Sequence, residues 1–172
     1  MSLAGAFDAV AGVLQQYGLV ALLGIAVLEG AMLLYFAPSE SLVPAAVVLL
    51  AESAVDVASV VAVAVLGATA GQTALFLVAR RGGREFLLET RWFRVSEDRL
   101  DRFDAWFERY GPAAVAATNS LLFVRGLLTV PAGVSDMSLR RFVALSALGS
   151  LSFQTILAAV TVYAPDLLAG LL

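Results

Sequence analysis

The sequence predicts an all-α membrane protein of two inverted repeats, each with an interfacial amphipathic helix, a re-entrant helical hairpin and a transmembrane helix. Three observations favour this fold class. Of the 172 residues, 60% are hydrophobic, more than a soluble domain normally carries. The apolar residues gather in long uncharged blocks, which indicate helices that cross a membrane. The two halves of the chain also carry matching motifs in the same order.

The first half begins with helical spacing of apolar side chains over residues 3–17, which predicts a short amphipathic helix at the membrane surface. Residues 18–37 are apolar except for Glu29. Pro38 and Pro44 follow, and the apolar piece after them is too short to cross a bilayer. We therefore expect a re-entrant hairpin, whose broken backbone must be covered by protein or line a water-filled cavity.

Two segments, residues 57–79 and 142–164, contain no charge and are long enough to cross the hydrocarbon as helices. Between them, residues 80–110 hold eight of the eleven arginines and seven acids. This polar centre is interpreted as a solvated face whose charge sets the topology, with binding to anionic lipid as the alternative. Its second part predicts another amphipathic surface helix that ends at Gly111-Pro112.

The second half repeats the interruption seen in the first. Residues 112–134 are apolar but contain Asn119 and Arg125. Proline and glycine disrupt helices, so four residues are predicted to break the two hairpins. They are Pro38, Pro44, Pro131 and Gly133.

The matching motifs predict one domain over residues 1–172, with repeat one at about 3–82 and repeat two at about 96–165. The shared motifs are Tyr-Gly at 17–18 and 110–111, Val-Pro-Ala at 43–45 and 130–132, and Gly-x-x-x-x-Gln-Thr at 67–73 and 149–155. Residues 1–79 contain no arginine, so segment 80–110 is predicted to be cytoplasmic. The two spans then run in opposite directions, as in the inverted repeats of many transporters.

The composition excludes several kinds of chemistry. Without cysteine or histidine, the chain has no disulfide, zinc finger or imidazole catalyst. The sequence shows no phosphate-binding glycine loop, nucleophile elbow or cluster of metal ligands. A net charge of −3 does not support a nucleic-acid-binding face. We therefore expect a protein that is not an enzyme and needs no cofactor or metal.

An ionisable side chain near the middle of a bilayer is costly, so such residues are candidates for function. Glu40 is either a proton-titrating carboxylate or countercharge, or a helix-capping acid at a wet turn. Arg125 is either a clamp for a lipid phosphate or a structural ion-pair partner of Glu29 or Glu40. Glu29 serves either transport or hydrogen bonding between helices. Asn119 is expected to bond backbone across its hairpin.

The sequence resembles the DedA family, also called the VTT or SNARE-associated domain family, over roughly residues 15–164. The most specific motif is the family's R-F-x-P-x-x-R-t-x-x-x-x-P-A-G-x-x-x-M-x-x-x-x-F, of which Arg125, Pro131-Ala132-Gly133, Met137 and Phe142 are kept. The other matches are Glu29 with Pro38-Ser39-Glu40, Gly71 with Arg80-Arg81-Gly82-Gly83, and Trp106 to Gly111. The chain departs from the pattern where Asn119 replaces the first motif arginine, Leu122 replaces the motif proline and Gln72 replaces a common acid.

The resemblance implies a multi-pass protein of the plasma membrane that flips or scrambles a lipid, for example a polyprenyl phosphate. Its partners would be lipids with anionic or phosphate headgroups and, if transport is ion-coupled, protons. Family members use membrane-embedded acids and arginines, which points to Glu29, Glu40 and Arg125, with Asn119 at a motif position. Two alternatives stay open: a proton-coupled transporter of small solutes or ions, and a non-transporting membrane assembly factor. The resemblance leaves the oligomeric state open.

Overall fold

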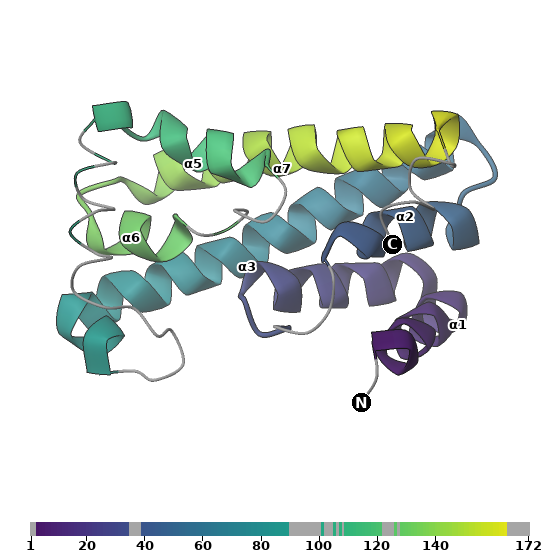
Figure 1. Ribbon diagram of the computed structural model, residues 1–172, viewed down its shortest axis with the longest axis horizontal. Coiled ribbons are helices and arrows are strands. Elements are labelled where there is room, and N and C mark those ends of the chain that lie inside the picture. The colour runs from purple at the N-terminus through teal and green to yellow at the C-terminus, as the bar shows by residue number, and fades with distance from the viewer. Residues whose placement is uncertain are drawn as a thin grey trace.

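The computed structural model describes residues 3–34, 39–89, 101, 105, 107, 109–121, 126 and 128–164. Within these ranges, the side chains of residues 3–8, 39–40 and 84–89 lie outside the description. The elements of the described part are all helices (Figure 1). They are α1 (Leu3–Gly30), α2 (Ser39–Leu50), α3 (Ala54–Glu89), α5 (Ala113–Asn119), α6 (Thr129–Val134) and α7 (Leu139–Tyr163).

Three described segments are long and apolar enough to cross a membrane: Ala9–Gly30, Ala54–Gly83 and Leu139–Tyr163. The second and third contain nearly all of the uncharged spans predicted at 57–79 and 142–164. The helix α3 begins three residues earlier than predicted because Ser53 caps it. The Asp56 N–H donates to the Ser53 hydroxyl oxygen at 3.3 Å, while the Asp56 carboxylate accepts the Ser53 N–H at 2.9 Å, which is the reciprocal pattern of a capping box.

The boundary expected at Gly18 is confirmed as a kink inside α1. Gly18 has φ 56° and ψ −133°, a backbone conformation that glycine adopts without the strain of a side chain. Two shorter helical pieces therefore meet there, and Figure 1 shows the N-terminal piece of α1 turned away from the rest of the helix. Gly111, at the equivalent point before α5, also has a positive φ of 64°.

The two long helices α3 and α7 pack antiparallel (Figure 1). Late in α3, Phe76 stacks on Phe142 near the start of α7, with ring centroids 4.3 Å apart. Early in α3, Val61 shares a core cluster with Leu157 near the end of α7. The prediction that the two spans run in opposite directions is therefore confirmed at the level of their packing.

The helix α1 runs alongside α3 at a very short separation. Gly67 and Gly71 make this possible, because a Cβ atom on Gly67 would lie 2.6 Å from the Cβ of Ala26, and one on Gly71 would lie 2.1 Å from the Val27 carbonyl oxygen. Small residues four apart permit such backbone contact between helices in membranes. Because later residues of α1 meet later residues of α3, the two helices are parallel.

The structure corrects the roles of two predicted breakers. Pro44 does not interrupt the first hairpin, because it lies inside α2. Pro131 lies in the first turn of α6, where a missing N–H leaves no intrahelical hydrogen bond unmade. Gly133 is also inside α6, and its lack of a side chain lets α6 approach α3, since a Cβ would lie 2.6 Å from the Phe76 carbonyl oxygen. Pro38 lies outside the described residues.

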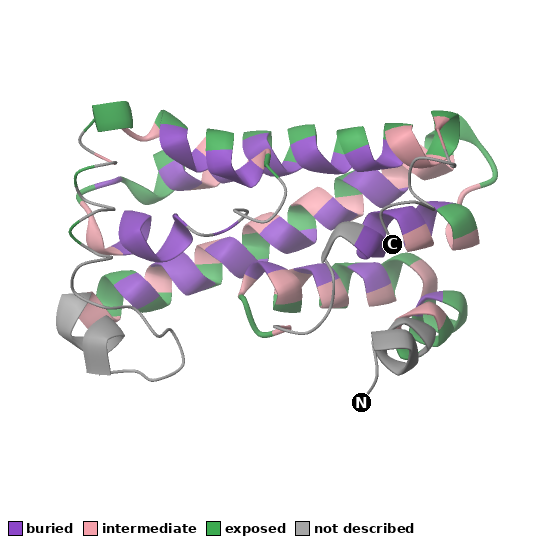
Figure 2. Ribbon diagram, in the orientation of Figure 1, coloured by how far each residue is buried: buried purple, intermediate pink, exposed green. Residues whose placement is uncertain are grey.

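The two short helices α2 and α6 each pack against the long helix of the other half of the chain. The helix α2 contacts α7, and α6 contacts α3. Buried residues line the faces that these helices turn toward one another, while exposed residues lie on the outside (Figure 2). The outer surface carries large apolar side chains, among them Val20, Val48, Leu66 and Ile156. An apolar outside is what a lipid-facing bundle requires.

Candidate functional site

A buried network of neutral polar groups lies in the middle of α3. Gln72 is 1% exposed, and its side chain points at Asn119 from the end of α5 and Ser146 from α7. Asn119 Nδ2 donates to Gln72 Oε1 at 3.0 Å, and the Ser146 hydroxyl donates to the same oxygen. The network therefore ties three helices together through side chains that carry no charge.

Asn119 is the centre of this network. Besides its bond to Gln72, its Nδ2 approaches Ser146 Oγ at 3.4 Å. Its Oδ1 accepts the backbone N–H of Gly126 at 2.9 Å and lies 3.4 Å from Gln72 Nε2. An amide side chain has two donor hydrogens and an oxygen with two lone pairs, so these contacts use its full capacity. The expectation that Asn119 bonds backbone across its hairpin is confirmed.

The bond to Gly126 fixes the break between α5 and α6. Gly126 is buried and has φ 74°, a conformation that suits glycine. It is also the residue that directly follows Arg125 in the sequence. The side chain of Asn119 thus holds the backbone next to the predicted phosphate-binding arginine, while Arg125 itself lies outside the described residues.

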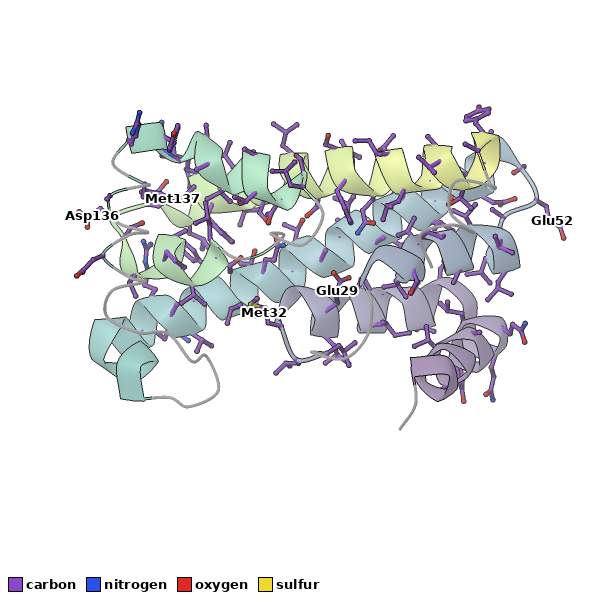
Figure 3. The ribbon with its side chains drawn as sticks, viewed as in Figure 1. Glu29, Met32, Glu52, Asp136 and Met137 are labelled. Atoms are coloured by element: carbon purple, nitrogen blue, oxygen red, sulfur yellow. The ribbon has the colours of Figure 1, made fainter. Side chains whose placement is uncertain are left out.

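Glu29 reaches the same part of α3 from the other side. It is half-buried near the end of α1, and its Oε2 atom is buried. Figure 3 shows its side chain pointing from α1 toward α3 near the middle of the molecule. The next residue, Gly30, packs against α3 so closely that a Cβ would lie 2.3 Å from the Ala68 carbonyl oxygen.

The ends of both interrupted segments therefore converge on one stretch of α3. The end of α1 packs against Ala68 and Gly71, and the end of α5 bonds to Gln72. These residues lie near the centre of the apolar segment Ala54–Gly83. Glu29 and Asn119 are consequently brought to one level of the bundle. The side chains of Glu40 and Arg125 lie outside the described residues, so their distance from this level is not defined.

Two polar residues of this region did not stand out in the sequence. Ser146 is fully buried in the network, and Thr129, at the start of α6, is 1% exposed with a hydroxyl that has no hydrogen-bond partner among the described residues. A signal for Ser146 existed, because Ser146, Ser150 and Gln154 lie four residues apart and so share one face of α7. All three are buried. Serine and glutamine at that spacing indicate contacts between membrane helices.

Arg80 has a structural role that the prediction of a solvated charged face missed. Its guanidinium donates to the carbonyl oxygens of Ser135 at 2.9 Å and of Met137, just beyond the end of α6. It also lies 4.7 Å from the centre of the Phe76 ring. A cation that bonds carbonyls beyond a helix C-terminus stabilises that end. Arg80 therefore fastens the turn between α6 and α7 to α3.

The part of the chain that the structure describes contains no group of three acidic, histidine or cysteine residues able to hold a metal ion. The polar network consists of amides, hydroxyls and backbone groups, which are poor ligands for transition metals and do not shuttle protons at neutral pH. The titratable group at this level among the described residues is Glu29. Among the described residues, the arrangement fixes the backbone of Gly126, which follows Arg125 in the sequence.

Comparison with protein families gives a match to the VTT domain over residues 37–163. The chain belongs to the VTT-domain family. This confirms the resemblance to the DedA family and covers α2 through α7, whereas Glu29 and α1 precede the matched part. No solved structure matches the chain.

Among curated VTT-domain relatives, undecaprenyl phosphate transporter A of Bacillus subtilis (strain 168) is 25% identical over 127 residues, which are 73% of this chain and 64% of the relative. The protein of the same name from Staphylococcus aureus (strain NCTC 8325 / PS 47) is 25% identical over 142 residues, 80% of this chain and 69% of the relative. The uncharacterized membrane protein YkoX of Bacillus subtilis (strain 168) is 29% identical over 109 residues, 63% of this chain and 49% of the relative. The matched part thus spans roughly half to two thirds of each of these relatives.

Proposed function

We propose that this VTT-domain protein translocates an anionic lipid across the membrane, with a polyprenyl phosphate as the substrate class. The observation that carries the proposal is the convergence of α1 and α5 on the middle of α3, at Ala68 to Gln72. Transporters place their substrate site near the midplane, where interrupted helices meet. The names of two relatives, undecaprenyl phosphate transporter A, support the substrate class.

A shared contact supports the inverted repeats. In each half, one glycine of the long helix packs against two atoms of the first helix of that half, α1 or α5: a carbonyl oxygen, and a Cβ atom three residues later. The contacts are Gly67 with the Leu23 oxygen and Ala26 Cβ, and Gly149 with the Ala116 oxygen and Asn119 Cβ.

The contacted residues of the two halves are separated in the sequence by as many residues as the two positive-φ glycines are. Gly18 and Gly111, the positive-φ glycines before the two apolar segments, are 93 residues apart, as are the two carbonyl residues (23 and 116) and the two Cβ residues (26 and 119). The contacting glycines, Gly67 and Gly149, are 82 residues apart, so the 93-residue spacing holds for the contacted helices α1 and α5 and not for the long helices. Together with the antiparallel packing of α3 and α7, this spacing supports duplicated halves of opposite orientation.

We propose that both hairpins are re-entrant. Ala9–Gly30 is long enough to cross a membrane if straight, but the kink at Gly18 divides it. The part from Leu19 to Gly30 is twelve residues, about 18 Å at the helical rise of 1.5 Å. That is short of the hydrocarbon thickness of about 30 Å. The arm α2, also twelve residues, would then return to the side from which the chain entered.

In this proposal Arg125 contacts the lipid phosphate, and Asn119 holds the backbone beside it. Glu29 and Glu40 are the candidate countercharges for Arg125 while no lipid is bound, and either carboxylate can carry a coupled proton. The segment 80–110 would face the cytoplasm, in accordance with its arginines.

The test is a flipping assay on the full chain reconstituted in vesicles, with fluorescent polyprenyl phosphate and, separately, a zwitterionic phospholipid. We expect transbilayer movement of the phosphate lipid that Arg125→Ala and Glu40→Gln abolish, whereas Glu52→Gln, at the far end of the bundle, has no effect. Equal rates in the wild type, Arg125→Ala and Glu40→Gln would disprove the site. A proton or solute flux without lipid movement would favour a small-solute transporter instead.

A further inference from the structure

One end of the molecule carries an exposed basic patch, defined here as Arg81, Arg140 and Arg141. All three side chains are exposed, at the point where α3 leaves its apolar segment and α7 begins. The acid nearest in sequence to the α7 arginines is Asp136, which is also exposed. Figure 3 shows Asp136 at this end of the molecule and Glu52 at the opposite end.

The contacts of Arg80 hold this end together. Its guanidinium bonds the Ser135 and Met137 carbonyls, so the turn that leads into α7 is fastened to the end of α3. Arg81 follows in α3, and Arg140 and Arg141 follow that turn in α7. Arg80 therefore keeps the three exposed arginines at one end of the molecule, while its own guanidinium is hydrogen-bonded to backbone carbonyls.

The positive charges of the arginines at the start of α7 are not balanced by an acidic side chain in the same turn. Arg140 and Arg141 lie in its first turn, which contains no acid. The N-terminal end of a helix has a partial positive charge, so cations there are destabilising and an anion is stabilising. Arginine also binds phosphate in a bidentate manner that suits a headgroup.

The position of the patch selects the kind of anion. Leu139–Tyr163 is long and apolar enough to cross the membrane, so its first turn lies at the border of the hydrocarbon. At that depth phosphate groups belong to lipids and not to free solutes. We propose that the basic patch binds the headgroup of an anionic phospholipid of the surrounding leaflet, separately from the lipid that is transported.

The experiment measures binding of phosphatidylglycerol and of phosphatidylcholine to the purified full chain by native mass spectrometry, in a neutral detergent. For the wild type we expect preference for phosphatidylglycerol. Each arginine near an anionic headgroup contributes about fivefold in affinity, so the triple variant R81Q/R140Q/R141Q should lose about 100-fold. Phosphatidylcholine binding should stay unchanged in the same variant.

Two variants separate the patch from net charge. Asp136→Asn and Glu52→Gln each remove one negative charge, the first beside the patch and the second at the opposite end. We expect Asp136→Asn to strengthen phosphatidylglycerol binding about fivefold and Glu52→Gln to leave it unchanged. A gain in affinity is also an outcome that misfolding cannot imitate.

Equal phosphatidylglycerol affinity in the wild type and the triple variant would overturn the proposal. Equal strengthening by Asp136→Asn and Glu52→Gln would also overturn it, because net charge alone would then explain binding. So would displacement of the lipid by millimolar inorganic phosphate, which would indicate a site for a free anion.

Discussion

Replacing Asn119 by alanine tests whether the neutral network holds the two halves together. The variant removes four polar contacts in a site that is 2% exposed. Hydrogen bonds between membrane helices average about 0.6 kcal/mol each, which gives about 2.4 kcal/mol. The Gly126 N–H, left buried without its acceptor, raises the expected loss in the free energy of unfolding to about 3–4 kcal/mol.

The assay is unfolding in mixed micelles of a mild detergent and sodium dodecyl sulfate, followed by circular dichroism. The matched control is Ser120→Ala, the next residue, whose hydroxyl donates to the Ala116 carbonyl at 2.8 Å and reaches the Gly149 carbonyl of α7 only at 3.5 Å. We expect that control to change the unfolding free energy by less than about 0.5 kcal/mol. A double-mutant cycle with Gln72→Ala should give a coupling of about 1–2 kcal/mol. Equal stability of Asn119→Ala and Ser120→Ala, or additive effects in the cycle, would refute the reasoning.

Three further predictions use the same unfolding assay. Gly71→Ala should destabilise the protein by about 1–3 kcal/mol because its Cβ would enter the α1 backbone. The control Gly24→Ala, whose Cβ would meet no atom within 4 Å, should stabilise it by up to about 1 kcal/mol. Equal effects would show that α1 and α3 can separate without cost. Thr129→Val should stabilise the protein by about 1 kcal/mol, because it removes a buried hydroxyl without a partner among the described residues. Thr118→Val should not, because the Thr118 hydroxyl bonds the Ala114 carbonyl. A loss of stability in Thr129→Val would reveal a partner for that hydroxyl. Arg80→Gln should lower the unfolding free energy by about 1 kcal/mol and raise the rate of amide hydrogen exchange in residues 133–138. Unchanged exchange would show that Arg80 does not hold the turn between α6 and α7 against α3.

The sequence predicted the long helices and their opposed directions because uncharged runs and arginine distribution are local signals. It predicted the boundary at Gly18 from the end of a periodic pattern. It was wrong at Pro131, because a proline in the first turn does not end a helix and the sequence alone did not reveal where α6 begins. It was also wrong at Pro44, which lies in the second turn of α2 without ending that helix. It also missed the carbonyl contacts of Arg80, because a turn 55 residues later supplies them.

The candidate site was predicted in part. Asn119 was expected to bond backbone across its hairpin, and Gln72 was noted as the residue that replaces a common acid. That these two bond each other could not be read from the sequence, since 47 residues separate them. The meeting of α1 and α5 on α3 likewise depends on close contacts at Gly71 and Gln72, which only the folded chain displays.

Two departures from the pattern of the DedA resemblance are one feature of the folded molecule. The resemblance implies an acid at the position of Gln72 and an arginine at that of Asn119, and the two side chains present are hydrogen-bonded to each other. A neutral pair thus occupies positions for which the resemblance implies charges, so introducing one charge alone should be costly. Gln72→Glu or Asn119→Arg alone would bury an unpaired charge, at about 3–5 kcal/mol each. The double variant should recover at least about 3 kcal/mol of the summed loss, because the two charges then pair. Thermal unfolding of the three variants measures this, and losses that simply add would mean that the two positions act independently.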